Sequence, residues 1–274
     1  MQPILHRQVA LASPAVLVSE PPAVVREVVL PAAVAAAVWR GDQLGSAPAS
    51  TLPSGFAALD AELPGGGWPC QGLTEILSPH AGVLEWRLLA PLLRTLTQAG
   101  QPVVVHGPPR PPHPPGLRAD GVDERSLVWV QADTPADRLW AAEQLVRGNV
   151  GGVLIAWLPQ ARPEQLRRLQ VLAAAGRGPV FVCRPQAAAR ESSAAPLRLL
   201  ARVGPGWTLQ VDVLKRRGPP LAHTLTLPSV PGGLAGLLTP RLLRPAAALP
   251  LALASGDGHV VVSPVAARSD AAVH

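Results

Sequence analysis

The segment best placed to carry nucleotide chemistry is a turn between a short apolar run and a helical pattern. It reads Ser78-Pro79-His80-Ala81-Gly82-Val83-Leu84-Glu85. A phosphate-binding loop of the form GxxxxGK[ST] holds phosphates with backbone N–H groups and a lysine, and its Ser or Thr holds Mg²⁺. The eight residues contain neither that lysine nor a hydroxyl after it, and the only lysine of the chain, Lys215, lies far away. Glu85 adds negative charge beside any phosphate, so we predict a degenerate loop that holds no nucleotide cofactor.

Two further positions lack the acids that nucleotide hydrolysis requires. The apolar run 152–157 ends in Trp157, where a carboxylate would have to hold the metal. The run 102–106 ends in His106 rather than in an acid that could orient a water molecule. The seven histidines show no metal-ligand spacing, and no Ser/His/Asp arrangement can be assigned. We therefore expect no enzyme activity, no metal and no small-molecule substrate; an ATPase that uses Arg87 in place of the lysine is kept as an alternative.

The elements that position these residues follow from hydrophobic periodicity. Apolar runs rich in β-branched residues predict five strands, at 73–77, 102–106, 127–131, 152–157 and 179–183. Helical spacing predicts helices at 85–99, from Asp133 or Thr134 to about 147, and at 163–175, although Pro91 conflicts with the first of them.

The alternation of these strands and helices defines the fold class. Continuously apolar strands separated by helices are typical of a mostly parallel sheet covered by helices on both faces. Residues 207–214 and 223–227 instead alternate between apolar and polar, with a turn at 215–218 between them. The chain is thus predicted to be an α/β protein with a C-terminal antiparallel hairpin at the sheet edge.

Composition limits the cellular setting. The 274 residues fit one α/β core with extensions, and Cys70 and Cys183, without metal spacing, are interpreted as packing residues in a reducing cytoplasm. The apolar run 22–38 is interrupted by charges and a proline well short of the ~20 residues of a membrane span. We therefore predict a cytoplasmic protein that does not enter the membrane.

The net charge of +6 keeps nucleic acid and acidic protein surfaces among the candidate partners. Abundant Ala, Arg, Pro and Gly is typical of a GC-rich genome, so arginine content alone indicates no nucleic-acid role. The candidate contacts with DNA or a partner are the turn Lys215-Arg216-Arg217 and, after the fifth strand, Arg190 and Arg198. A solvated basic turn is the alternative interpretation.

The seven tryptophans could include base-stacking residues, but tryptophans within apolar strands and helices usually belong to the core. Trp68, which follows a run of three glycines, is the predicted exception.

Several ordered segments resemble known proteins. Residues 52–60 (LPSGFAALD), 63–69 (LPGGGWP) and 72–76 (GLTEI) resemble the opening of the RecA core, in which a Ser-Gly-x-x-x-Leu-Asp segment and a glycine turn precede the phosphate-loop strand. Together with 38–44 and the segments Leu139–Gln144 and Leu214–Gly218, they make the chain resemble the ImuA family of RecA/SulA-like proteins associated with translesion synthesis. The resemblance covers residues 38 to 228.

This resemblance implies an organisation and a role. It implies a RecA-like core with a degenerate phosphate loop (38–228); the flanking residues, without sustained periodicity, are predicted to be an N-terminal extension (1–37) and a low-complexity C-terminal tail (229–274). The implied role is that of a non-catalytic accessory protein in SOS-induced, error-prone translesion DNA synthesis. Its implied partners are an ImuB-like homologue of Y-family polymerases and a DnaE-type error-prone polymerase, and contact with RecA or DNA is left open. The alternative within the same resemblance is a SulA-like inhibitor of cell division, which would bind the division GTPase.

Overall fold

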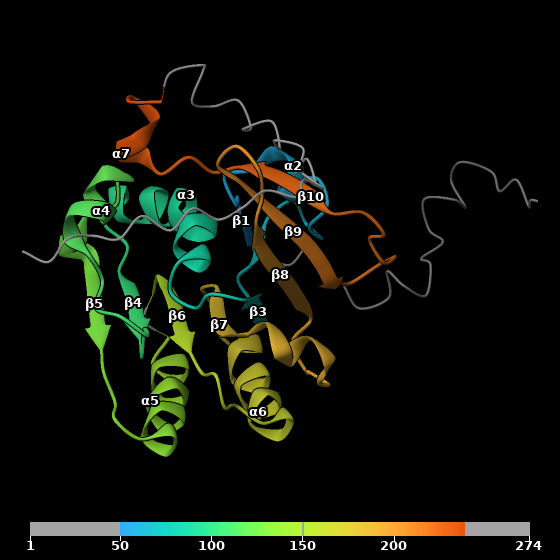
Figure 1. Ribbon diagram of the computed structural model, residues 1–274. Coiled ribbons are helices and arrows are strands. Elements are labelled where there is room, and N and C mark those ends of the chain that lie inside the picture. Colours follow the sequence, from blue (N-terminus) through green and yellow to red (C-terminus); the bar gives the residue numbers. More distant parts are fainter. Residues whose placement is uncertain (1–49, 150, 239–274) are drawn as a thin grey trace, which may run out of the picture. The chain divides into compact units, whose positions relative to one another are not determined.

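The computed structural model describes residues 50–149 and 151–238, and their central feature is an eight-stranded sheet with the order β10-β9-β8-β3-β7-β6-β4-β5 (Figure 1). In chain order its strands are β3 (Leu73–Ser78), β4 (Val103–His106), β5 (Leu127–Val130), β6 (Val153–Trp157), β7 (Val180–Pro185), β8 (Leu197–Val203), β9 (Thr208–Lys215) and β10 (Leu225–Pro228). Strands β3 to β8 run parallel, whereas β9 is antiparallel to both β8 and β10. The predicted α/β fold with a mostly parallel sheet and C-terminal antiparallel strands is confirmed.

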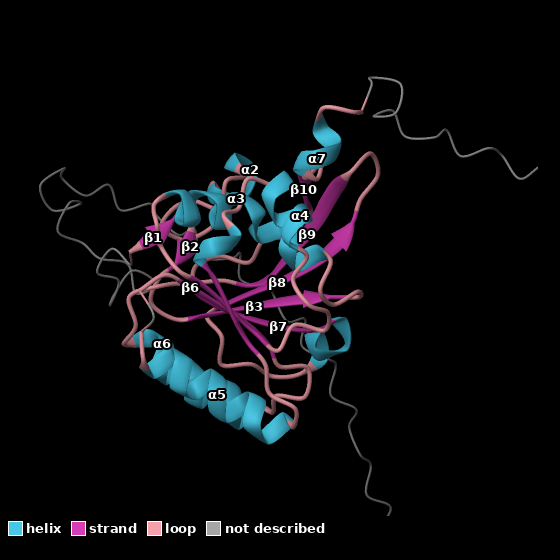
Figure 2. Ribbon diagram, turned by 90° about the vertical axis from the view of Figure 1, so that its left-hand side faces the viewer, coloured by secondary structure: helices cyan, strands magenta, loops and turns pink. Residues whose placement is uncertain are grey.

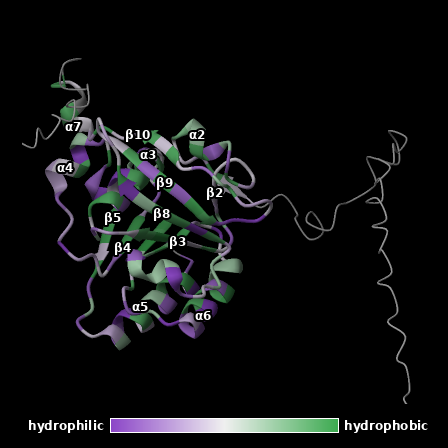
Figure 3. Cartoon of the chain, turned by 45° about the vertical axis from the view of Figure 1, so that its right-hand side comes forward, coloured by the Kyte–Doolittle hydropathy of each residue, from purple (hydrophilic) through white to green (hydrophobic). Residues whose placement is uncertain are grey.

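Helices cover both faces of this sheet. Helices α3 (Leu84–Gln98) and α4 (Pro114–Ala119) lie on one face, and α5 (Pro135–Arg147) and α6 (Pro163–Ala174) on the other (Figures 1 and 2). In β6, Ile155 and Trp157 pack with α3 while Leu154 and Ala156 pack with α5 and α6. Every residue of β6 is buried, because a strand that lies between two layers of helices meets water on neither face. Figure 3 accordingly shows the central strands mostly as hydrophobic.

Two elements differ from the prediction. No strand was predicted between the fifth strand and residue 207, yet β8 lies there and pairs in parallel with β3. Helix α4 was not predicted either; it begins at Pro114, where a proline costs no helical hydrogen bond. The side chain of His113 caps α4 by accepting a hydrogen bond from the N–H of Gly116 at 3.1 Å.

The smaller elements lie at the beginning and the end of the described residues. The strands β1 (Thr51–Leu52) and β2 (Trp68–Pro69) form a separate two-stranded sheet, which was not predicted. The remaining short helices are α2 (Ala57–Asp60), η1 (Glu124–Ser126), η2 (Gln186–Arg190) and α7 (Gly232–Ala235). The predicted hairpin is present as β9 and β10, but residues 216–224 connect its strands in place of the expected turn at 215–218.

Helix α3 continues through Pro91 without a break. Proline has no N–H, so the carbonyl of Arg87, four residues earlier, loses its helical donor. The hydroxyl of Ser229 donates to this carbonyl at 3.5 Å, and the Arg87 guanidinium donates back to the Ser229 carbonyl at 2.6 Å. The segment after β10 therefore replaces the missing bond, which explains how the predicted conflict at Pro91 is resolved.

Only one of the two predicted domain boundaries, the one after residue 228, lies among the residues that the structure describes. The extension 1–37, the first core residues 38–49 and residues 239–274 of the tail lie outside the described residues. At the other boundary, Ser229 contacts α3, and the N–H of Gly232 donates to Asp120 at 2.6 Å. Contacts with the core thus extend beyond residue 228. No helix in the described part of the chain has the length and apolar character needed to cross a bilayer.

Candidate functional site

The degenerate loop lies where parallel α/β sheets bind their ligands. It follows the carboxyl end of β3, and the later strands continue on both sides of β3, with β7 on one side and β8 on the other. Ligands of open α/β sheets bind at this edge, at the point where the strand order reverses. Helix α3 starts at Leu84, directly after the loop, so its unpaired N–H groups face the same place.

The side chain of Glu85 fills the anion position of this loop. One carboxylate oxygen accepts a hydrogen bond from the Ser78 hydroxyl at 2.8 Å. The other accepts from the backbone N–H groups of Gly82 at 2.9 Å and Val83 at 3.2 Å. Glu85 is fully buried, and it lies in the first turn of α3, where the helix dipole favours a negative charge. The donors that would cradle a phosphate are therefore satisfied by the protein itself.

The charge of Glu85 also affects its surroundings. Burial, and then the negative charge of Glu85, raise the pKa of the Cys183 thiol well above its ordinary value. Cys183 is fully buried in the core on the α3 face, in keeping with its interpretation as a packing residue. A triphosphate brought to the loop would meet the same negative charge, and it would have to displace the Glu85 carboxylate from the Ser78 hydroxyl and from the N–H groups of Gly82 and Val83.

The side chain of Arg87, considered as a replacement for the lysine, does not contact the loop, and Lys215, the only lysine, is also engaged elsewhere. Arg87 donates to the carbonyl of Trp207 at 2.9 Å and to that of Ser229 at 2.6 Å, and burial lowers its pKa although the charge of Asp120 raises it. Lys215 donates to the Ser193 carbonyl at 2.9 Å. Both side chains thus bind backbone carbonyls away from Ser78–Glu85, which counts against the ATPase alternative.

The other two positions examined for acids are built into the core. The ring nitrogens of His106 lie 3.2 Å from the carbonyl oxygen of Val130 and 2.8 Å from that of Arg138. Trp157 is buried and packs against Trp86, with ring centroids 5.7 Å apart. Among the residues that the structure describes, no three His, Cys, Asp or Glu side chains are grouped as metal ligands would be.

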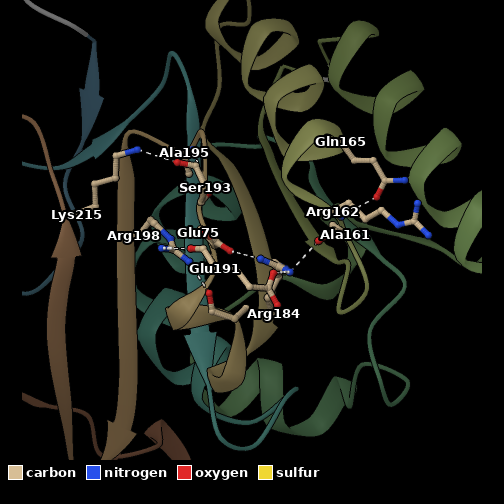
Figure 4. Close-up of polar contacts among 11 residues, drawn as sticks. Glu75, Ala161, Arg162, Gln165, Arg184, Glu191, Ser193, Ala195, Arg198 and Lys215 are labelled. Carbon is tan, nitrogen blue, oxygen red and sulfur yellow. Dashed lines mark hydrogen bonds and ion pairs between the residues drawn. The ribbon is translucent and has the colours of Figure 1, made fainter.

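Arg198, predicted as a contact with DNA or a partner, is buried within the protein. Its side chain lies in β8, is 8% exposed, and donates to the carboxylate of Glu75 at 2.6 Å (Figure 4). Its other two nitrogens donate to the carbonyls of Ala188 at 2.9 Å and Glu191 at 3.1 Å. Its burial was not foreseen because β8 was not predicted; as the second residue of β8, Arg198 lies opposite Glu75 of the neighbouring strand β3.

Glu75, which the sequence interpretation overlooked, is the centre of this buried cluster. It is fully buried and also accepts from Arg184 at 2.9 Å, while Arg184 donates to the carboxylate of Glu191 at 2.6 Å (Figure 4). The two arginines therefore fasten the segment 186–191 to the sheet. A carboxylate inside an apolar strand is seldom buried without paired cations. The presence of Glu75 in the apolar run 73–77 could therefore have indicated buried arginine partners.

The remaining predicted contact residues lie on two neighbouring segments. Arg190 ends η2 and is exposed, and Lys215 reaches the segment after η2 through its bond to Ser193. Arg216 is half-buried and forms an ion pair with Glu62 at 2.9 Å, whereas Arg217 is exposed. Of the predicted contact residues, the structure thus leaves Arg190, Lys215 and Arg217 exposed.

The prediction that Trp68 is the exposed tryptophan is wrong. Trp68 is fully buried and packs edge-to-face against Phe181, with ring centroids 5.1 Å apart, so it is not the exposed exception. The exposed tryptophans of the described residues are Trp129, Trp140 and Trp207. Of these, Trp207 also has a left-handed backbone, with φ at +64°.

A cleft of about 410 Å³ lies between the amino-terminal ends of α5 and α6. Its lining includes one acid, two arginines, two amides and two leucines: Asp133, Arg138, Arg162, Gln160, Gln165, Leu139 and Leu158. Arg138 already donates to the Ala132 carbonyl at 2.8 Å. The mixed lining indicates no particular ligand.

Neither protein-family models nor curated proteins provide a match to this sequence.

Proposed function

We propose that this chain is a non-catalytic binding protein with a RecA-like core, in which the former nucleotide position is closed by the carboxylate of Glu85. The observation that carries the proposal is the set of hydrogen bonds from Ser78, Gly82 and Val83 to that carboxylate. Nucleotide binding would require the protein to break these bonds and to bring a triphosphate next to a buried negative charge. A protein that keeps this arrangement uses its surface for recognition.

The biological role that we propose is accessory to SOS-induced, error-prone translesion DNA synthesis. The support is the resemblance of several ordered segments to the ImuA family, together with large apolar side chains that the structure leaves exposed, among them Trp129, Trp140 and Trp207. The proposed partners are an ImuB-like homologue of Y-family polymerases and a DnaE-type polymerase, with RecA as a further candidate. A SulA-like role, with the division GTPase as the partner, is the competing proposal.

The test compares partners directly. The full chain, carrying an affinity tag, is mixed with the purified ImuB-like protein, the DnaE-type polymerase and the division GTPase of the same genome. We expect stable binding to the ImuB-like protein and none to the division GTPase. The reverse result would replace the translesion role with the SulA-like one. Titration with Mg-ATP in the same buffer is expected to give no saturation up to about 1 mM, corresponding to a free energy of binding weaker than about −4 kcal/mol.

Direct DNA contact is a separate part of the proposal. The exposed cations Arg190, Lys215 and Arg217 lie on segments that the Lys215–Ser193 bond links, which gives phosphates neighbouring positive charges. The triple alanine variant is expected to weaken single-stranded DNA binding and to lower the salt slope by about 0.7 for each phosphate that is no longer neutralised. Arg147→Ala, at an exposed position at the end of α5, is the control. Equal DNA binding by the triple variant and the wild type would remove these residues from the proposal.

A further inference from the structure

The strand β5 forms one edge of the eight-stranded sheet, and its outer side pairs with no other strand of the residues that the structure describes (Figure 1). The carbonyl of Val130 accepts a hydrogen bond from the N–H of Gly107, the residue after β4, at 3.0 Å. Successive residues of a strand direct their N–H and C=O groups to opposite sides, so the backbone groups of Leu127 and Trp129 point away from the sheet. The outer side of β5 therefore presents backbone donors and acceptors to which a further strand can bind.

Large apolar side chains on both faces of the sheet border this edge. Val128 is 49% exposed and Trp129 is 47% exposed. Trp129 lies opposite Val105 of β4, which belongs to the core on the α3 face. Val128 lies opposite Val104, which belongs to the core on the face of α5 and α6. A strand that binds beside β5 would thus cover apolar surface on both faces at once.

The opposite edge of the sheet is protected in a way that β5 is not. Along β10 burial alternates, and the exposed residues are Thr226, which is polar, and Pro228, which has no N–H. Charged residues and proline are means by which edge strands avoid pairing with other chains. The four residues of β5 include neither. An apolar edge without such protection is expected to be covered in the functional protein.

Two residues of opposite charge flank β5 symmetrically. Arg125 lies four residues before Trp129 and Asp133 four residues after it, and both charged side chains are exposed. Neither forms an ion pair with another residue of the described ranges. The acids before Arg125 are already engaged, Glu124 in an ion pair at 3.4 Å and Asp123 as the cap of η1. The strand is therefore bordered by one positive and one negative charge that are available to a partner.

We propose that β5 is the interface of a two-fold symmetric dimer, in which the β5 strands of two copies of this chain pair antiparallel with their Trp129 residues opposite each other. In this register each Trp129 exchanges both of its backbone hydrogen bonds with its counterpart, and Leu127 faces Gln131 of the second copy. Arg125 of each copy lies next to Asp133 of the other, so both ends of the interface carry an ion pair. The two eight-stranded sheets then form one continuous sheet.

The occupant follows from the strand's complementarity to itself. Two-fold symmetry requires a surface that matches its own copy, and opposite charges at equal distances from a central residue meet this condition in the antiparallel arrangement. A parallel arrangement would place Arg125 beside Arg125 and Asp133 beside Asp133, and these like charges would repel. Facing aromatic side chains stabilise cross-strand pairs, as two Trp129 rings would here. Single-stranded DNA fits less well, because its phosphates would meet the acids Asp123 and Asp133 next to the strand.

The test is the oligomeric state of the full chain, measured by sedimentation velocity from about 1 to 200 µM. Interfaces of this small size bind weakly, so we expect a monomer–dimer equilibrium with a Kd of about 10 µM. Val128→Lys places a charge on the edge of each copy and should raise the Kd at least about 10-fold. Val171→Lys, the same change at a valine that is 67% exposed on α6, is the matched control and should leave the Kd unchanged within a factor of about two.

Charge reversal tests the register. Arg125→Asp replaces both ion pairs between the copies with pairs of like charge, and Asp133→Arg does the same, so each single variant should raise the Kd about 10-fold. The double variant restores opposite charges at both ends, and its Kd should return to within about threefold of the wild-type value. Arg147→Asp, at an exposed position at the end of α5, is the control and should not change the Kd.

Circular dichroism at about 1 µM, where the monomer predominates, checks that each variant is folded. All of the substituted side chains are exposed, so each Tm should lie within about 2 °C of the wild-type value. Should Val128→Lys nevertheless fail to fold, the charge-reversal variants still decide, because their positions lie outside the strand.

Three results would overturn the dimer. The wild type could remain monomeric at about 200 µM, the variants could dimerise like the wild type, or the double reversal could bind no better than the single ones. Slow amide exchange of Trp129 in a monomer would show that another part of the chain covers the edge, which also excludes the dimer. None of these measurements involves the ImuB-like protein, so failure of the dimer and failure of the proposed function are distinguishable.

Discussion

Replacing Glu85 with alanine tests the central element of the structure. The change leaves the Ser78 hydroxyl and the N–H groups of Gly82 and Val83 without their acceptor. Each of the three buried donors left without a partner costs about 1–3 kcal/mol. Removal of the buried negative charge of Glu85 is favourable and offsets part of this total cost. We expect the free energy of unfolding to fall by about 3–5 kcal/mol. At about 2–4 °C per kcal/mol for a protein of this size, the Tm should fall by about 10 °C.

Glu85→Gln is the conservative comparison. The amide oxygen can accept from Gly82 and Val83, and the amide NH₂ can donate to the Ser78 hydroxyl, which also accepts. All three contacts are preserved with one of them reversed, so we expect a loss of only about 1 kcal/mol. Glu164→Ala removes an exposed acid from the first turn of α6 and is the matched control, with an expected effect below about 0.5 kcal/mol.

The decisive assay is rescue by an anion. Thermal unfolding is followed by circular dichroism in sodium sulfate or phosphate and, at equal ionic strength, in sodium chloride. In Glu85→Ala the vacated donors should bind the oxyanion, and at about ten times its Kd the gain is about 1.4 kcal/mol, or about 3–6 °C. Sulfate and phosphate also stabilise folded proteins generally by exclusion from their surface, so the expected gain is that of Glu85→Ala in excess of the wild type, whose own carboxylate occupies the donors. Equal stabilisation of both proteins, or a fall in Tm of less than about 2 °C for Glu85→Ala, would refute the reasoning.

Three other predictions concern the core. Burial raises the pKa of Cys183, so the stabilisation by its thiol form is complete below about pH 8.5 and is lost as the pH rises towards the folded-state pKa. The free energy of unfolding of Cys183→Ala, measured with urea, should therefore fall less steeply with rising alkaline pH than that of the wild type. An identical pH dependence of the two proteins would contradict this. Glu75→Ala removes the carboxylate that pairs with two buried guanidinium groups, leaving Arg198 without an acidic partner and Arg184 with Glu191 alone. The change should cost about 3–5 kcal/mol by urea unfolding, so a loss below about 1 kcal/mol would show that the cluster is not coupled. In Gly152→Ala the new methyl group would overlap the carbonyl oxygen that precedes β4, so soluble expression should drop sharply, whereas Gly236→Ala, with open space around it, should express like the wild type.

The sheet was predictable because its signal is local. Runs such as Val103–His106 and Val153–Trp157 are buried on both faces, so their β-branched composition alone marks them as strands. Strand β8 was missed because Arg198 and Arg202 interrupt its apolar pattern. Those charges are tolerated only because Glu75 and Asp212 pair with them, and these partners lie on other strands. A pairing across strands leaves no periodic trace in the sequence.

The candidate site was predictable in one respect only. The missing lysine after Gly82 is visible in the sequence, and it excludes the ordinary mode of phosphate binding. That Glu85 turns back to accept hydrogen bonds from its own loop depends on the geometry of backbone N–H groups, which residue types do not encode. The strain at Trp207 was equally hidden, because a left-handed tryptophan is the opposite of what turn statistics favour.

The pairing between Pro91 and the segment after β10 has a consequence for synthesis on the ribosome. The donor to the carbonyl of Arg87 is the hydroxyl of Ser229, which is translated 142 residues later. At about 5–20 residues per second, roughly 7–28 seconds pass before the helix around Pro91 receives its last stabilising contact. Until then the Arg87 carbonyl can accept hydrogen bonds only from water, so the helix around Pro91 completes its hydrogen bonding after nearly all of the sheet has been synthesised.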